Sequence, residues 1–173
     1  MQTRFLIITG MSGAGKTQVV RTLEDLKYFC IDNLPAALIP KFAELCRQTS
    51  ESNVALVVDV RGGQFFDKLL QVLDEITASG QKYELLFLDA DDATLVRRYK
   101  ETRRRHPLGD SDTLLDNLAQ ERQLLEPLLE KASYIINTSE LNATELKNRI
   151  KELFSTDNER ERMGIVVRSF GFK

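Results

Sequence analysis

Residues 8–20 read ITGMSGAGKTQVV, and this stretch indicates the architecture of the chain. Within it, Gly10 to Thr17 match the pattern Gly-x-x-x-x-Gly-Lys-Thr, whose glycines allow the backbone to turn until successive N–H groups point into one hollow. A run of apolar residues precedes the pattern, and an amphipathic helical segment follows it. A strand, a glycine-rich turn and a helix in this order predict a loop that binds the phosphates of a nucleoside triphosphate.

The residues of this phosphate loop, Gly10 to Thr17, have separate expected roles. The Lys16 ammonium group would reach the β- and γ-phosphates and act in catalysis, and the Thr17 hydroxyl would bind Mg²⁺. The positive N-terminal end of the following helix would strengthen the attraction for phosphate. The predicted ATP-binding set is therefore Gly10, Met11, Ser12, Gly13, Ala14, Gly15, Lys16 and Thr17.

Short apolar runs alternate with helical patterns along the chain. The predicted strands are Phe5–Thr9, Tyr28–Ile31, Val54–Val58, Glu84–Leu88 and Tyr134–Ile136. Most lack polar alternation, as expected of parallel strands that helices cover on both faces. The alternation predicts an α/β fold: a doubly wound, mostly parallel five-stranded sheet with helices on both faces, of the P-loop NTPase, nucleotide-kinase-like type.

Helices are predicted from apolar spacing and from capping signals. A stripe of apolar residues from Leu69 to Ile76 ends before Gly80, and residues 112–131 form a long helical pattern. Asn142 followed by Glu145 fits a capping box at the start of a last helix. These segments lie between the predicted strands or after the last of them, as a doubly wound fold requires.

Composition and the ends of the chain narrow the class of protein. A net charge of −2 argues against a protein that coats nucleic acid non-specifically. The first apolar run is too short for a signal peptide or a membrane span, so we expect a cytoplasmic protein without a membrane partner. Residues 1–155 are the predicted nucleotide-binding domain, 156–163 a linker, and 164–173 the start of a truncated second domain.

Acidic residues follow three of the predicted strands: Asp32, Asp59 and Asp89. Ligands of open parallel sheets bind outside the carboxyl ends of the strands. Asp59 is the preferred partner of Thr17 for Mg²⁺ and the second expected catalytic residue, because its strand usually neighbours the first; Asp89 is the second choice. Asp32 and Asn33 occupy the place where small-molecule kinases of this type bind the acceptor.

Residues 97–105 contain six basic residues within nine. One interpretation is a solvated charged face. A second is a lid like that of nucleoside-monophosphate kinases, in which Arg97, Arg103 and Arg104 close over a transferred phosphate or a second anionic ligand. A third is an RNA-binding stripe, for which Tyr99 would be the single stacking aromatic. The position after the fourth strand favours phosphate.

Several segments together resemble one family. SGAGKT, LEDLKYFCIDNLP, DVRGG, LFLDADDATLVRRYKETRRRHPL, LLEPL and the terminal SFGFK are similar to segments of the RapZ/YvcJ family of bacterial P-loop nucleotide-binding proteins. The resemblance spans essentially the whole chain. It implies ATP, GTP and Mg²⁺ as ligands, weak ATPase and GTPase activity in some members, and a guanine-nucleotide site at Asp59, Val60, Arg61 and Gly62.

The resemblance also implies a second domain and macromolecular partners. Some members act as adapters that hand a small regulatory RNA to a ribonuclease and sense an amino-sugar phosphate, mainly through the C-terminal domain. A homo-oligomer is expected for such an intact protein. For this chain the resemblance therefore implies RNA and ribonuclease partners only through the C-terminal domain.

Three functions stay open at this point. The first is a regulatory nucleotide-binding domain that hydrolyses ATP or GTP slowly. The second is a small-molecule or nucleotide kinase with an arginine lid. The third is a non-enzymatic RNA adapter with a vestigial nucleotide site, which would bind RNA in a salt-dependent manner even without Lys16.

Overall fold

The computed structural model describes residues 4–49, 53–59, 63–102 and 114–155. Five strands form one sheet in the order β2-β3-β1-β4-β5, and every pair of neighbours is parallel. The strands are β1 Arg4–Gly10, β2 Phe29–Asp32, β3 Asn53–Val57, β4 Glu84–Asp89 and β5 Tyr134–Asn137. All five strands predicted from the sequence are confirmed, and β3 does lie next to β1.

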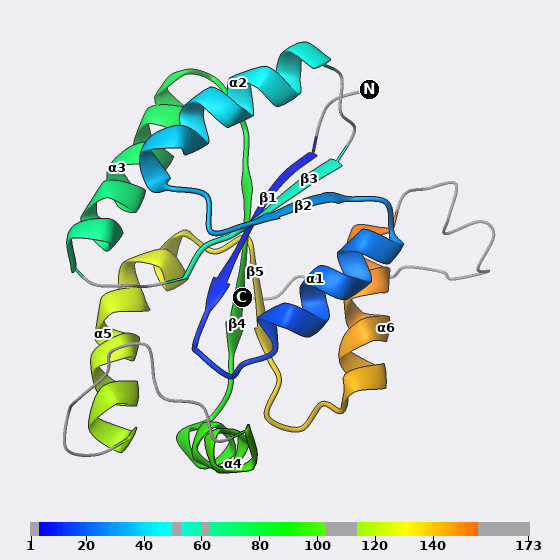
Figure 1. Ribbon diagram of the computed structural model, residues 1–173, viewed down its shortest axis with the longest axis vertical. Coiled ribbons are helices and arrows are strands. Elements are labelled where there is room, and N and C mark those ends of the chain that lie inside the picture. The colour runs from blue at the N-terminus through cyan, green and yellow to red at the C-terminus, as the bar shows by residue number, and fades with distance from the viewer. Residues whose placement is uncertain (1–3, 50–52, 60–62, 103–113, 156–173) are drawn as a thin grey trace.

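Helices connect and cover the strands. They are α1 Lys16–Asp25, α2 Ile39–Thr49 after a short 3₁₀ turn η1 Ala36–Leu38, α3 Gly63–Ala78, α4 Asp92–Thr102, α5 Leu114–Lys131 and α6 Ala143–Phe154. Figure 1 shows α1 and α6 on one side of the sheet and α2, α3 and α5 on the other, with α4 beyond the carboxyl end of β4. The doubly wound α/β class is thereby confirmed.

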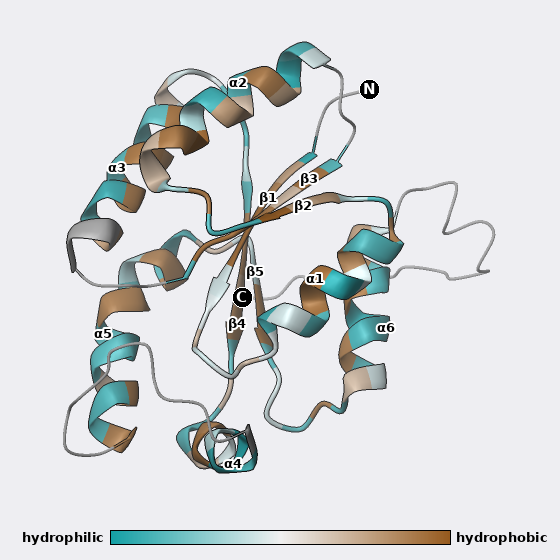
Figure 2. Ribbon diagram, in the orientation of Figure 1, coloured by the Kyte–Doolittle hydropathy of each residue, from teal (hydrophilic) through white to brown (hydrophobic). Residues whose placement is uncertain are grey.

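The core lies in the three central strands. Residues Phe5–Ile8, Val54–Val57 and Leu85–Leu88 are each at most 5% exposed. Figure 2 shows these strands in brown, with the apolar faces of the helices turned toward them. The outer strands are more open, since Phe29 of β2 and Ile135 of β5 are about half exposed. A sheet covered on both faces explains why the central strands lack polar alternation.

The last helix begins with the predicted capping box. The Asn142 side chain accepts a hydrogen bond from the Glu145 amide at 2.8 Å, and the Glu145 carboxylate accepts one from the Asn142 amide at 2.8 Å. The helix ends at Phe154, next to the predicted domain boundary at residue 155. The predicted linker 156–163 and second-domain segment 164–173 lie outside the described residues.

The capping box yields a stability prediction. Asn142→Ala should lower the free energy of unfolding by about 1 kcal/mol, because an amide of the first turn of α6 loses its acceptor. Urea denaturation followed by circular dichroism measures the change. Asn148→Ala, at an exposed position inside the same helix, is the matched control and should not lower the free energy of unfolding, because alanine favours a helix interior more than asparagine does. Equal losses in the two variants would contradict the capping role.

Candidate phosphate-binding site

The phosphate loop leaves the carboxyl end of β1, in the middle of the sheet. Gly10 has φ +143°, and a Cβ atom at this position would lie 2.1 Å from the Leu88 carbonyl oxygen of β4. The next residue, Met11, donates its N–H to the same oxygen at 3.0 Å. A glycine is therefore required where the loop begins, because the backbone of β4 occupies the space of any side chain.

The loop ends by becoming the first turn of α1. Gly15 is the N-cap residue of this helix and has φ +111°. As a glycine it offers no side chain to bond the N–H groups of the first turn, and that turn contains no acidic residue. The N–H groups of this turn and the positive end of the helix are the groups that would attract an anion.

Lys16 is held across the mouth of the loop. Its Nζ donates hydrogen bonds to the carbonyl oxygens of Gly10 at 2.9 Å and Met11 at 3.0 Å. The Asp59 carboxylate, directly beyond β3, lies 3.8 Å from the same nitrogen. The Lys16 side chain is 13% exposed. The loop thus places one ammonium group where the phosphates of a nucleotide would bind.

Burial controls the charge of this amine. Desolvation lowers the pKa of Lys16 below its ordinary value of 10.5, because the charged form loses water. The carboxylates of Asp59, Glu121 and Asp32 act in the opposite direction and favour the charged form, but burial is the larger effect. A phosphate bound beside Lys16 would add another negative charge and raise this pKa.

The predicted magnesium donors lie at the same edge of the sheet. Thr17 is exposed in the first turn of α1, and Asp59 is partly exposed beyond β3. The Val58 amide donates to the Ile8 carbonyl oxygen at 2.9 Å, which fixes the backbone before Asp59 against β1. A hydroxyl and a carboxylate are hard oxygen donors that fit Mg²⁺, which is commonly held by one or two carboxylates together with water and phosphate oxygens.

The remaining predicted site residues are only partly described. Asp32, the last residue of β2, and Asn33, with φ +61°, are exposed at this edge of the sheet. Arg97 is exposed on α4. The predicted guanine-nucleotide residues Val60, Arg61 and Gly62 and the lid residues Arg103 and Arg104 lie outside the described ranges.

Arg98, which the sequence analysis did not single out, braces the loop from α4. Its guanidinium donates to the Gly13 carbonyl oxygen at 3.0 Å and to the Thr138 carbonyl oxygen at 2.7 Å. The Thr138 hydroxyl, just beyond β5, donates to the Ala14 carbonyl oxygen at 2.7 Å. A signal was available: Arg98 follows buried Thr94 and Leu95 by four and three residues, on the inner face of the helix.

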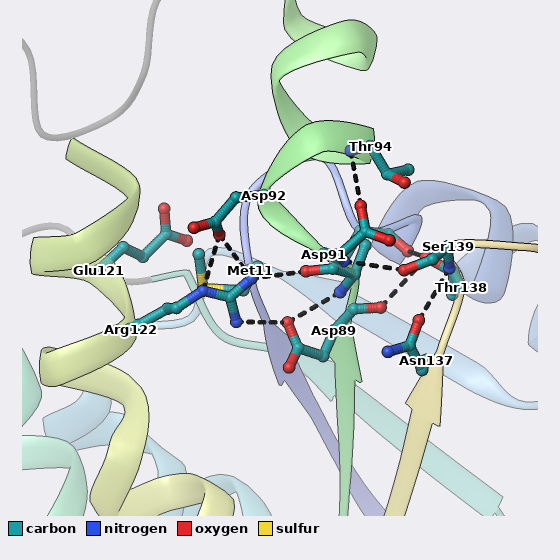
Figure 3. A network of polar contacts seen from close by, with 12 residues as sticks. Met11, Asp89, Asp91, Asp92, Thr94, Glu121, Arg122, Asn137, Thr138 and Ser139 are labelled. Atoms are coloured by element: carbon teal, nitrogen blue, oxygen red, sulfur yellow. Dashed lines mark hydrogen bonds and ion pairs between the residues drawn. The ribbon is translucent and has the colours of Figure 1, made fainter. Parts of the chain in front are cut away.

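Helix α5 reaches the site through two consecutive charged residues, Glu121 and Arg122, which sequence reasoning also missed. Figure 3 shows Arg122 between Asp89 and Asp92. The nitrogen–oxygen distance to each carboxylate is 2.8 Å. Arg122 also donates to the Ala90 carbonyl oxygen at 2.6 Å. The Asp89 carboxylate, the second choice for Mg²⁺, is thus paired with an arginine.

Glu121 contacts the phosphate loop itself. Its Oε1 accepts a hydrogen bond from the Ser12 amide at 2.6 Å, and the residue is 2% exposed. The sequence signal was a charged residue within an apolar stripe, three residues after Leu118 and four before Leu125. Spacing alone does not say what a buried carboxylate in such a stripe contacts.

Comparison with known proteins identifies the family. The family model described as the RapZ-like N-terminal domain matches residues 3–158. The chain belongs to this family. A nucleotide-binding protein of Clostridium botulinum (strain Loch Maree / Type A3) is 51% identical over 98% of this chain, and the match covers 59% of that protein. The chain therefore spans about three fifths of the length of this curated relative.

Solved structures show the same fold at low sequence identity. Shikimate kinase from Bacteroides thetaiotaomicron matches with a TM-score of 0.56 and 19% identity, covering 94% of this chain and 99% of that one. The tunicamycin resistance protein of Deinococcus radiodurans matches with a TM-score of 0.60 and 17% identity, covering 90% and 98%. Within the described residues, no helix is both long and apolar enough to cross a membrane.

Proposed function

We propose that this chain is a regulatory nucleotide-binding domain that binds ATP and GTP with Mg²⁺ at Gly10–Thr17 and hydrolyses them slowly. One observation carries the proposal: the Lys16 ammonium lies across the loop, 2.9 and 3.0 Å from the Gly10 and Met11 carbonyl oxygens, beside Asp59. Membership of the RapZ-like family and the similarity to a nucleotide-binding protein of Clostridium botulinum support it.

Different residues would bind the phosphates and the Mg²⁺ of the nucleotide. The Lys16 ammonium would bind the β- and γ-phosphates, and the N–H groups of the loop and of the first turn of α1 would surround them. Thr17 and Asp59 would hold Mg²⁺, which bridges phosphate oxygens and neutralises their charge. Arg98 and Arg122 donate to the protein's own groups in this conformation. A guanidinium that stabilises the transferred phosphoryl group speeds turnover greatly, and these two are engaged with the protein itself, so we expect slow turnover.

Titration calorimetry with ATP and with GTP, each with Mg²⁺, tests this function and ranks the two bases. Phosphate release should be slower than about one turnover per second, the low end for kinases. Asp59→Asn should reduce the gain in nucleotide affinity that Mg²⁺ provides. Asp25→Asn, at the far end of α1, should leave the affinity and its Mg²⁺ dependence unchanged. A folded parent that binds neither nucleotide would overturn the proposal.

The lowered pKa of Lys16 gives a pH prediction. Below that pKa the amine is charged and ATP affinity is at its full value; above it the amine is neutral and the affinity is lost. ATP affinity should therefore fall as pH rises, and the fall should begin below pH 10.5. Dissociation constants between pH 7 and 10 measure the effect. Lys16→Arg is the control, because a guanidinium stays charged throughout this range. Identical pH profiles would contradict the assignment.

A second candidate function is phosphoryl transfer to a small acceptor. Its support is the position of Asp32 at the same sheet edge, close enough for its charge to favour the protonated form of Lys16. Product analysis with panels of nucleoside monophosphates and small hydroxyl compounds tests it. Transfer that greatly exceeds hydrolysis would favour a kinase, and hydrolysis alone would favour the regulatory domain.

The longer relatives give the domain a wider context. Because the chain spans only 59% of the Clostridium relative, we propose that nucleotide occupancy here regulates RNA binding by a further, C-terminal domain, as the family resemblance implies. The chain alone should then bind RNA weakly. Strong salt-dependent RNA binding by this chain that persists in Lys16→Ala would instead favour the adapter with a vestigial nucleotide site.

A further inference from the structure

A buried carboxylate already occupies a donor of the phosphate loop. The Glu121 Oε1 atom accepts the Ser12 N–H at 2.6 Å, and hydrogen bonds to a carboxylate are shorter and stronger than those between neutral groups. The residue is 2% exposed, and its charge favours the protonated form of Lys16. The loop that is built to surround an anion therefore contacts one supplied by the protein itself.

Packing alone does not explain this residue type. Glu121 lies among the buried residues of α5, between Leu118 and Leu125, where an apolar side chain would fill space without losing water. A buried carboxylate costs free energy unless a donor compensates it. Here the donor is an amide of the phosphate loop, and the nearby ammonium of Lys16 adds attraction. The Ser12 amide thus offsets part of the cost of burying the Glu121 carboxylate, and the carboxylate gives that amide an acceptor.

The neighbouring residue extends the contact to a second strand. Arg122 pairs with Asp89 at the end of β4 and with Asp92 at the start of α4, each at 2.8 Å. Glu121 contacts the loop that leaves β1. Two consecutive side chains therefore attach α5 to the loop that follows β1 and to the carboxyl end of β4, at the edge where phosphate would bind.

We propose that Glu121 is an internal anion that holds the phosphate loop in the absence of nucleotide and competes with the nucleotide's phosphates. This inference rests on the proposed function. Phosphates that enter the loop bring negative charge close to the Glu121 carboxylate in a site with little water, where like charges repel strongly. Triphosphate binding therefore weakens the hydrogen bond between the Ser12 N–H and Glu121. The contact of α5 with the loop thus depends on whether the loop holds a nucleotide.

Glu121→Gln removes the charge and keeps both the side-chain volume and an oxygen that can accept the Ser12 N–H. The test is titration calorimetry of the parent and this variant with AMP, ADP and ATP, in the presence of Mg²⁺. ATP should bind about tenfold more tightly to the variant, which corresponds to about 1.4 kcal/mol. The gain should shrink from ATP to ADP to AMP, because fewer phosphates meet the carboxylate.

Glu126→Gln, an exposed position on the same helix, is the matched control and should leave all three affinities unchanged. Thermal melting establishes that each variant is folded. A merely structural Glu121 would change the three affinities by the same factor. That result, or an unchanged or weaker ATP affinity in folded Glu121→Gln, would overturn the inference and leave the proposed function standing. If neither the parent nor the variant binds ATP, the proposed function fails and this inference fails with it.

Discussion

Lys16→Ala should weaken the binding of ATP with Mg²⁺ at least about a hundredfold, which corresponds to about 2.7 kcal/mol. The variant removes the ammonium that lies across the loop, and the phosphates lose a charge-assisted partner that is itself largely shielded from water. Titration calorimetry measures the change directly. The magnitude follows from burial, since the Lys16 side chain is only 13% exposed and little solvent screens the interaction.

Two further variants separate binding from folding. Lys16→Met keeps most of the side-chain volume and should lose as much affinity as Lys16→Ala, since the charge carries the effect. Lys41→Ala removes an exposed ammonium on α2, whose side chain is 70% exposed, and should bind ATP like the parent. A folded Lys16→Ala protein with parental affinity would mean that the nucleotide binds elsewhere.

Gly10→Ala should lower the free energy of unfolding by more than about 3 kcal/mol, or prevent folding. The added Cβ atom would meet the Leu88 carbonyl oxygen at 2.1 Å and the Leu88 nitrogen at 2.7 Å, both backbone atoms of the central strand β4. The residue also has φ +143°, which side chains disfavour. Neither strand can move away without breaking the β1–β4 ladder.

Gly80→Ala supplies the matched control. Gly80 has φ +82°, but a Cβ atom there would have nothing within 4 Å, so only the backbone conformation opposes the substitution. The cost should be about 1 kcal/mol, the penalty of a side chain in the left-handed conformation. Urea denaturation measures the free energy of unfolding of Gly10→Ala and Gly80→Ala against that of the parent. Equal losses would mean that backbone conformation alone, and not the contact with β4, requires glycine at the start of the loop.

The sheet was predictable from the sequence because its determinants are local. Each central strand is a continuous apolar run, such as Leu85–Leu88, and each run is bounded by polar or glycine residues. The phosphate loop was equally predictable, since its spacing reflects backbone geometry from Gly10 to Lys16. Helix α2 was not singled out, because its buried face consists of Ile39, Ala43 and Cys46, a weaker apolar stripe than that of α3.

The side chains that hold the loop and its surroundings, Arg98, Glu121 and Arg122, were not predictable in the same way. The basic run was interpreted as one patch, but neighbouring residues on a helix point about 100° apart. Arg97 is exposed, whereas Arg98 donates to the Gly13 carbonyl oxygen. Glu121 and Arg122 are also neighbours on one helix with different partners, since Glu121 contacts the Ser12 amide and Arg122 pairs with Asp89. Their partners, in the loop and at the end of β4, depend on where α5 lies against the sheet, which no local pattern contains.

Backbone amide NMR of the isotope-labelled chain, recorded while ATP and Mg²⁺ are added, tests whether phosphates bind at the loop. The largest shift changes should fall on the amides of residues 10–17, with Ser12 among them as its bond to Glu121 weakens. In Lys16→Ala the changes should be absent at the ATP concentrations that saturate the parent. A folded chain whose amides at 10–17 do not respond, or whose largest changes lie elsewhere, would contradict nucleotide binding at this site.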